Sequence, residues 1–335
     1  MSRLENAAIR VGVVGAGYWG PNLIRNCADL GVLQGVCDAD DKALGLVHAT
    51  YPAAFTTRSY DELLGSDIDA VVVAAPAHLH AEFALRALDA GKHVFVEKPL
   101  ALSVVDGERV ARLADRKGLV AFVGHLLLYH PAVSKLRALV SAGEVGPVWH
   151  VRSRRLSLGK LRSHEDVWWS FAPHDVAVIL ALMGEEPTRA TALFSARRDL
   201  RRADAAYVDF EFSQGRSAHV EVCWLDPEKS ARLDVFGANG VITLKDSRGS
   251  SALTVRPFLV SGDSTDRPTV TRGEERNVAF EEQEPLRVEL QAFLAAIVDG
   301  SPVETDAWQG VRVLRALTLA ERGLEMRQDE REALA

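Results

Sequence analysis

The chain has 335 residues, of which 47% are hydrophobic and 25% are charged, a composition typical of globular proteins and not of disordered or collagen-like chains. Its formal net charge of −7 argues against a broad basic surface for nucleic acid. No apolar run approaches the roughly 20 residues needed to span a bilayer. We therefore expect neither nucleic acid nor a membrane as a partner.

The N-terminal residues lack the apolar segment and small-residue cleavage site of a secretory signal. The three cysteines, Cys27, Cys37 and Cys223, are an odd number and widely spaced. They resemble neither a disulfide framework nor a zinc site. These features predict a protein of the reducing cytoplasm without a bound metal.

Strand and helix patterns alternate over residues 1–123. The apolar run at residues 9–14 ends in a glycine-rich turn, which is typical of a buried parallel strand. A helix is expected from about Pro21, and Gly31 marks its end. Further strands are expected at 33–37, 68–74 and 93–96, and further helices near 61–64, 80–90 and 105–117. The alternation predicts an α/β Rossmann domain, a doubly wound parallel sheet, over residues 1–123.

The pattern changes from residue 124 onward. Successive strands with turn signals are expected from about 191 to 255, after an alternating stretch at 148–158. Helices are expected near 132–142, 176–183, 285–297 and 308–327. We interpret residues 124–335 as an α+β domain with a large, mostly antiparallel open sheet that binds substrate. An uncovered sheet face is a natural surface for oligomer formation.

The first turn has the spacing of a dinucleotide-binding loop, with Gly15, Gly17 and Gly20. The first glycine permits a tight turn, the second lets backbone N–H groups approach a pyrophosphate, and the third allows close packing of helix and sheet. The helix that follows directs its partial positive charge at the phosphates. We therefore predict a dinucleotide site at this turn, which also contains Ala16, Tyr18 and Trp19.

Asp38 stands at the end of the second strand, eighteen positions after Gly20. Its carboxylate is placed to accept hydrogen bonds from the adenosine ribose hydroxyls and to repel a 2′-phosphate. No arginine follows it, so the sequence favours NAD over NADP as the cofactor.

Two further segments follow predicted strands and should lie at the ligand-binding edge of the sheet: Ala75-Pro76 and Glu97-Lys98. A lysine buried beside a bound cofactor has a lowered pKa and can transfer a proton to or from a hydroxyl. The alternative is a surface lysine that pairs with Glu97. Composition alone leaves both interpretations open.

The chain resembles the Gfo/Idh/MocA family of sugar dehydrogenases. The matching segments are residues 11–20, 72–76 with His80, 90–100, Gly124-His125 and the helix that carries His174. The resemblance implies a Rossmann domain joined to an α+β substrate domain, in homodimers or homotetramers. It also implies that Lys98 lies between nicotinamide and substrate, that His174 belongs to the proton-transfer group, and that His80 touches the cofactor. The predicted cofactor contacts are then Gly15, Ala16, Gly17, Tyr18, Trp19, Gly20, Asp38, Ala75, Pro76, His80, Glu97 and Lys98.

One position departs from the family pattern. Many members carry aspartate four residues before the histidine, where this chain has Ser170. A serine can hydrogen-bond but cannot hold the negative charge that would raise the basicity of His174. Asp175 points about 100° around a helix and is a poor substitute. Three outcomes stay open: Lys98 and His174 share the proton transfer, the enzyme reduces a ketone with proton donation, or catalysis has been lost.

The predicted substrate contacts lie at and beyond the junction of the two domains. His125 is the candidate for a sugar hydroxyl. Arg155 and Arg162 belong to a stretch with five positive charges in eleven residues, which suits a phosphate or carboxylate. A solvated strand edge with salt bridges is the alternative. Trp169 suits stacking on a sugar or base ring, or core packing. The full predicted set is Lys98, His125, Arg155, Arg162, Trp169, Ser170 and His174.

These features predict an NAD-linked oxidoreductase that moves hydride between nicotinamide and a secondary alcohol or ketone of a sugar. The substrate we favour carries an anionic group, as a nucleotide sugar does, and reacts at C3; the position rests on family analogy. An inositol or free-sugar dehydrogenase is the alternative, because it would not need the arginine stretch. A regulator that binds NAD without turnover is a further alternative.

Overall fold

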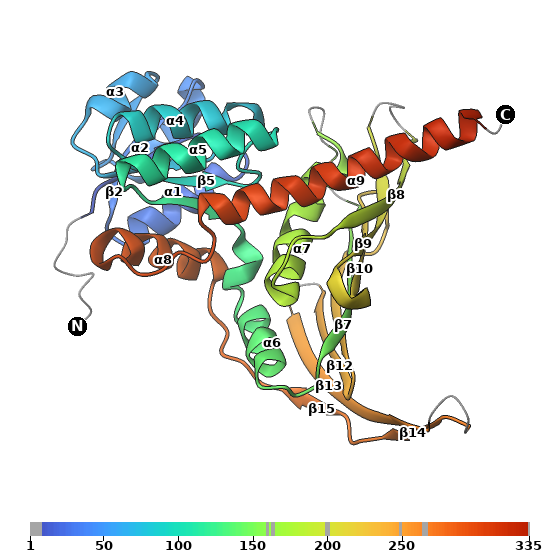
Figure 1. Cartoon of the computed structure of the whole chain (residues 1–335). Coiled ribbons are helices and arrows are strands. Elements are labelled where there is room, and N and C mark those ends of the chain that lie inside the picture. The colour runs from blue at the N-terminus through green and yellow to red at the C-terminus, as the bar shows by residue number, and fades with distance from the viewer. Residues whose placement is uncertain are drawn as a thin grey trace. The chain divides into compact units, whose positions relative to one another are not determined.

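The computed structural model describes residues 9–158, 161, 165–197, 202–247, 250–262 and 267–333. The chain forms two compact units (Figure 1). The first comprises the residues up to 126 together with Glu284–Leu314, and the second comprises Leu127–Gln283 and the residues from 315 onward. The first segment of the first unit ends at Leu126, three residues after the end of the proposed domain 1–123. The return of Glu284–Leu314 to the first unit was not predicted.

The first unit is built on a parallel sheet of six strands in the order β3-β2-β1-β4-β5-β6. The strands are β1 (Val11–Val14), β2 (Leu33–Cys37), β3 (Phe55–Thr57), β4 (Ala70–Val73), β5 (His93–Glu97) and β6 (Ala121–Gly124). This is the strand order of a doubly wound dinucleotide-binding sheet, so the predicted fold class is confirmed. Buried apolar residues fill β1, β4 and most of β5 because helices cover both faces of such a sheet.

Side-chain caps and glycines set the ends of several helices in this unit. Asp40, Ser59 and Ser103 each accept a hydrogen bond from a backbone N–H in the first turn of the helix that follows. Gly118 ends the helix that Ser103 begins and adopts the left-handed conformation, with φ of 62°. The helices are α1 (Gly20–Asp29), α2 (Asp41–Thr50), α3 (Tyr60–Gly65), the 3-10 turn η2 (Ala77–Leu79), α4 (His80–Asp89), α5 (Val104–Lys117) and α8 (Pro285–Asp299).

Helix α8 packs on the sheet of the first unit through an aromatic side chain. The Phe293 ring is fully buried and packs edge-on against Phe95 of β5 and Phe122 of β6, at centroid distances of 5.8 and 5.7 Å. The prediction placed all of residues 124–335 in the second domain, and this segment corrects it. The physical reason is that the apolar face of α8 is complementary to a sheet that precedes it by far in the sequence.

The second unit contains a nine-stranded sheet in the described residues, in the order β14-β13-β12-β11-β7-β10-β9-β8, with β15 paired to β13. All neighbouring strands are antiparallel except β7 and β10, so the predicted, mostly antiparallel sheet is confirmed. The strands are β7 (Val148–Leu156), β8 (Arg189–Ser195), β9 (Ala205–Glu211), β10 (Ser217–Cys223), β11 (Ser230–Gly237), β12 (Gly240–Ser247), β13 (Ser250–Ser261), β14 (Thr269–Arg272) and β15 (Arg276–Val278).

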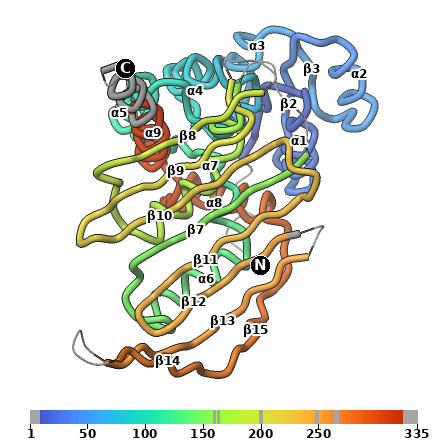
Figure 2. Tube along the Cα trace, turned by 90° about the vertical axis from the view of Figure 1, so that its right-hand side faces the viewer, coloured from blue at the N-terminus to red at the C-terminus, as the bar shows by residue number. Residues whose placement is uncertain are grey.

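Figure 2 looks onto one face of this sheet, and helices α6 (Pro131–Ser141) and α7 (Val167–Met183) lie behind it. Helix α7 is much longer than the predicted 176–183 and is apolar around most of its circumference, as expected for a buried helix. The remaining elements are the 3-10 turns η3 (Leu126–Tyr129) and η4 (Ser213–Gly215) and helix α9 (Ala307–Ala333).

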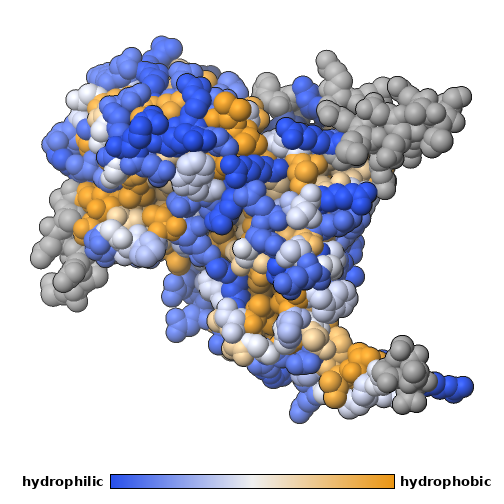
Figure 3. Space-filling view, in the orientation of Figure 1, coloured by the Kyte–Doolittle hydropathy of each residue, from blue (hydrophilic) through white to orange (hydrophobic). Residues whose placement is uncertain are grey.

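The hairpin of β13 and β14 carries exposed apolar side chains. Leu259, Val260 and Val270 are 56, 52 and 61% exposed, and Figure 3 shows an apolar patch over this end of the sheet. Among the described residues, no helix is both long and apolar enough to cross a membrane.

We predict that Phe293→Ala lowers the free energy of unfolding by about 3–5 kcal/mol, because it empties a fully buried aromatic site. Chemical denaturation measures the change. Val105→Ala on the exposed side of α5 is the control and should change stability by no more than about 0.5 kcal/mol. Equal stability of the two variants would contradict the assignment of α8 to the core of the first unit.

Candidate active site

The glycine turn between β1 and α1 has the geometry that the spacing predicts. Gly15 has φ of 101°, and a Cβ there would lie 2.6 Å from the backbone of Ala74. A Cβ on Gly20 would lie 2.0 Å from the carbonyl oxygen of Gly15. A Cβ on Gly17, in contrast, would meet no atom within 4 Å. Two glycines therefore close the turn, and the third leaves open space where a pyrophosphate would approach the backbone.

Asp38 is joined to this turn before any ligand binds. Its carboxylate accepts the backbone N–H of Ala16 at 2.6 Å and that of Asp40 at 2.8 Å. The N–H of Gly15 donates to the carbonyl of Cys37 at 2.8 Å. The end of β2 and the turn thus hold each other, and each carboxylate oxygen keeps a lone pair for a ribose hydroxyl. Open space at Gly17 and an oriented Asp38 fit a dinucleotide without a 2′-phosphate.

Glu97 connects the turn to the end of β5. Its Oε1 accepts the indole N–H of Trp19 at 2.7 Å, and its Oε2 accepts the backbone N–H of Lys98 at 3.2 Å. Burial raises the pKa of Glu97 to about 7, although the positive charge of Lys98 and these hydrogen bonds lower it. The Glu97 carboxylate therefore interacts with Lys98 in two ways, through the backbone N–H of that residue and through its charge.

His80 ties together the two loops that follow β4 and β5. The ring is 2% exposed, with Nδ1 2.7 Å from the carbonyl oxygen of Pro99 and Nε2 2.7 Å from that of Ala75. Both ring nitrogens therefore face backbone oxygens. The structure gives His80 a role in holding these loops, and a ring-nitrogen contact to a cofactor would replace one of these two contacts.

His125 follows β6 and is 2% exposed. Among the described residues neither ring nitrogen has a hydrogen-bond partner. Burial and the charge of Lys98 lower the pKa of His125 to about 3, so the ring is neutral at physiological pH. A neutral imidazole with unused nitrogens can donate to or accept from a sugar hydroxyl.

In the second unit, Ser170 and His174 lie one turn apart on α7, as predicted. Ser170 is 3% exposed and His174 is half-buried. The neighbouring carboxylate of Asp175 accepts Arg155 Nε at 2.7 Å, Arg155 Nη2 at 3.1 Å and the Ser153 hydroxyl at 2.6 Å. Asp175 therefore serves Arg155, as expected for a residue that points away from His174.

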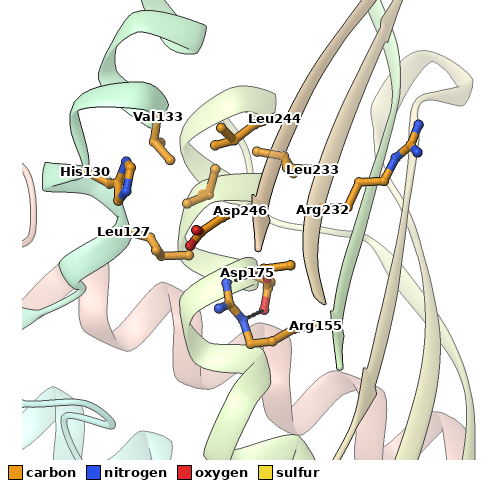
Figure 4. Close-up of a pocket in the computed structure, with 11 residues that line it drawn as sticks. Leu127, His130, Val133, Arg155, Asp175, Arg232, Leu233, Leu244 and Asp246 are labelled. Carbon is orange, nitrogen blue, oxygen red and sulfur yellow. Dashed lines mark hydrogen bonds and ion pairs between the residues drawn. The ribbon is translucent and has the colours of Figure 1, made fainter. Parts of the chain in front are cut away.

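A pocket of the second unit contains this ion pair (Figure 4). Arg155 and Asp175 lie at its base, and the carboxylate of Asp246 faces the same space, while the guanidinium of Arg232 points away toward Asp234. The other lining residues are Leu127, His130, Val133, Val178, Ala231, Leu233 and Leu244. One arginine faces two carboxylates here, so a phosphate at Arg155 would have to displace Asp175 and overcome Asp246.

The remaining predicted residues divide in a similar way. Trp169 is half-buried, and its indole N–H donates to Glu321 at 2.7 Å, whereas Trp168 is fully buried and donates to the carbonyl of Leu317. Trp169 is thus the tryptophan with a surface left for a ligand. Arg162 lies outside the described residues. Among the residues that the structure describes, no group of three His, Cys, Asp or Glu side chains forms a metal site.

The sequence did not predict the contacts or the burial of three acidic residues. Asp246 enters the pocket of the second unit, Asp175 neutralises Arg155, and Glu289 of α8 is a glutamate that is 0% exposed in the first unit. Only the burial of Glu289 had a signal in the sequence, because this residue stands four positions before a phenylalanine in an apolar helix pattern.

The comparisons with known families agree with the geometry. Residues 9–125 match the oxidoreductase family with an NAD-binding Rossmann fold. Residues 133–243 match the GFO/IDH/MocA C-terminal domain.

Similar proteins include sugar and inositol dehydrogenases. UDP-N-acetylglucosamine 3-dehydrogenase from Acidithiobacillus ferrooxidans is 29% identical over 92% of this chain and 95% of its own length. Inositol 2-dehydrogenase 1 from Saccharopolyspora erythraea is 28% identical, with 96 and 94% covered. A solved structure of the Acidithiobacillus enzyme superposes with a TM-score of 0.82 at 27% identity and covers 94% of this chain and 97% of that one.

We predict that Asp38→Ser weakens NADH binding about tenfold or more and strengthens NADPH binding, because it removes both the ribose acceptor and the repulsion of a 2′-phosphate. Fluorescence titration with each cofactor measures both affinities. Asp41→Ser, at an exposed neighbouring position, is the control. Unchanged preference in Asp38→Ser would contradict the assigned role of this carboxylate.

A second prediction concerns stability and pH. The folded pKa of His125, about 3, lies below its unfolded value, so its contribution to stability is present above about pH 6.5 and is lost as pH falls toward 3. The unfolding free energy of the wild type minus that of His125→Gln should therefore rise with pH by about 1.2 kcal/mol per unit between pH 4 and 5.5, and by about half as much per unit near pH 6.5, where half of the unfolded chains already carry a neutral imidazole. Denaturation at several pH values measures this difference. A pH-independent difference would show that His125 titrates normally.

Proposed function

We propose, on the premise that this chain belongs to the Gfo/Idh/MocA family of oxidoreductases, that it transfers hydride between NAD and a secondary alcohol or ketone of a sugar. The protein is an oxidoreductase with an NAD-binding Rossmann domain. The finer proposal is that the sugar is a nucleotide sugar that reacts at C3. The oligomer we propose is a homodimer or homotetramer through the sheet of the second unit, and the location is the cytoplasm.

One observation carries the assignment of the reacting group. Lys98 directly follows β5, at the carboxyl edge of the parallel sheet where ligands of this fold bind. The Glu97 carboxylate accepts hydrogen bonds from the backbone N–H of Lys98 and from the indole N–H of Trp19, which belongs to the dinucleotide turn. The lysine is thus fixed to the same element that should receive the cofactor, which is the arrangement a proton-transfer group beside a nicotinamide requires.

Bound nicotinamide supplies the hydride acceptor or donor. In the oxidising direction, the C–H bond of the substrate breaks with its electron pair and the hydroxyl loses its proton to a protein group. We assign this proton to Lys98, with His174 as the second proton-transfer group. In the reducing direction the same groups return the proton. Ser170 offers a hydrogen bond and no charge, so the basicity of His174 is not raised by a carboxylate at that position.

The similarity to the Acidithiobacillus enzyme, over nearly all of both chains, supports a nucleotide sugar. The pocket of the second unit refines the proposal. With Arg155 neutralised by Asp175 and Asp246 nearby, its polar and aliphatic lining suits an uncharged part of a sugar and not the diphosphate. This replaces the expectation that Arg155 holds the anionic group.

An inositol dehydrogenase is the second candidate, because relatives named inositol 2-dehydrogenase match with similar identity and coverage. The pairing of Arg155 with Asp175 favours this candidate as well, because an uncharged inositol does not require a cation from this arginine. Turnover of myo-inositol with no turnover of any nucleotide sugar would select it.

The test follows NADH absorbance with UDP-N-acetylglucosamine, UDP-glucose, sugar phosphates and myo-inositol as substrates. We predict turnover with a nucleotide sugar and a fall in kcat of about 10²–10⁴-fold in Lys98→Ala, with NADH binding retained, because the substitution removes the proton-transfer group. Lys135→Ala, on the exposed side of α6, is the control. Unchanged turnover in Lys98→Ala would reject the site.

A further inference from the structure

Glu289 of α8 is a glutamate without the partners that a buried charge requires. Its side chain belongs to a residue that is 0% exposed. Among the described residues, neither carboxyl oxygen has a hydrogen-bond partner. An ionised carboxylate in such a place is strongly disfavoured, whereas the neutral acid is tolerated. Burial accordingly raises the pKa of Glu289 well above its usual range, and the charge of Glu97 raises it further.

The periodicity of α8 and of the strands beneath it places Glu289. It stands four residues before Phe293 and therefore on the same side of the helix. The Phe293 ring rests on Phe95 and Phe122, which are register partners on β5 and β6. One helical turn is about 5.4 Å long, close to the length of about two strand residues. Glu289 therefore lies about that far from Phe293 on the same side of the helix, and the electrostatic effect of Glu97 indicates that it lies toward the residues two positions later in each strand.

Those two residues are Glu97 and Gly124, which are also register partners. A Cβ on Gly124 would lie 3.3 Å from both Cδ and Oε2 of Glu97, so the missing side chain leaves room for this carboxyl group. The two carboxyl groups therefore lie near the ends of β5 and β6, with Glu289 fully buried and Glu97 half-buried.

Their surroundings decide which of the two holds a proton. Glu97 accepts hydrogen bonds from Trp19 and from the backbone of Lys98, and the charge of Lys98 also favours its ionised form. Glu289 receives no hydrogen bond from any described residue. Two neighbouring carboxyl groups do not both ionise near neutral pH when one of them is fully buried and has no hydrogen-bond donor. The proton therefore resides on Glu289.

We propose that Glu289 and Glu97 form a carboxyl pair with one proton, in which the neutral acid of Glu289 steadies the charged Glu97 between the dinucleotide turn and Lys98. Glu289 is a positioning residue, because it acts through Glu97. An ionised Glu289 would add a second negative charge beside Glu97, and an apolar residue would leave Glu97 without a polar neighbour on that side. Both changes weaken the hold of Glu97 on the turn and on Lys98.

The first test is infrared spectroscopy of the whole protein at about pH 8.5, where Glu97, with a pKa of about 7, is ionised and contributes no protonated-acid band. The wild type should show the carbonyl band of a buried protonated carboxylic acid, and Glu289→Gln should lack it. Glu282→Gln, at an exposed position in the segment before α8, is the matched control and should keep it. A spectrum of Glu289→Gln identical to that of the wild type in this band overturns the proposal.

The second test separates positioning from folding. Glu289→Gln keeps the size, the neutrality and a polar end, so its NADH affinity and turnover should stay within about twofold of the wild type. Glu289→Met keeps the length but no polar end, so we expect NADH affinity or kcat to fall about tenfold. Its melting temperature should not fall, because an apolar side chain replaces a buried polar group.

Three results of the second test overturn the proposal: wild-type function in Glu289→Met, an equal loss in both variants, or a loss that follows a lowered melting temperature. The turnover measurement rests on the proposed function, whereas NADH titration and the infrared band do not. Failure of every sugar as a substrate would therefore reject the proposed function and leave the carboxyl pair to be decided by the other two measurements.

Discussion

The carboxylate of Glu97 is the contact on which the candidate site of the first unit depends. It receives the indole N–H of Trp19 from the turn after β1 and the backbone N–H of Lys98 at the end of β5. A hydrogen bond to a charged acceptor is stronger than one between neutral groups and more specific in direction. A single buried side chain therefore sets where the dinucleotide turn stands with respect to the lysine that we propose transfers the proton.

Neighbouring contacts reinforce the same loops by different chemistry. His80 bridges the carbonyls of Ala75 and Pro99, and Asp38 holds the backbone of the turn from the other side. These hydrogen bonds restrict the conformations of the loops, which lowers the entropy cost of binding a cofactor there. The open space is confined to the side of Gly17, where backbone N–H groups would meet the phosphates.

In the second unit, the positive charge inside the pocket is paired with a carboxylate. Its pocket contains an arginine, but Asp175 occupies the guanidinium and Asp246 adds a further negative charge. The positive charge of Arg155, which belongs to the basic stretch of the sequence, is thus neutralised inside the pocket. The residues that line the pocket offer hydrogen bonds and aliphatic surface. Together with Ser170 in the place of an aspartate, this leaves Lys98 and His174 as the groups to which we assign proton transfer.

The sequence by itself determined the fold class and the elements of local chemistry. The glycine spacing, Asp38 after the next strand and Lys98 after β5 were predictable, because a short turn or a strand end places its own residues whatever surrounds it. Only the tertiary structure decided the partners of buried charges. Asp175 takes Arg155, and α8 returns to set Glu289 beside Glu97. Such pairings join residues far apart in the chain, and a carboxyl group is neutral or charged according to what packs around it, which no local pattern records.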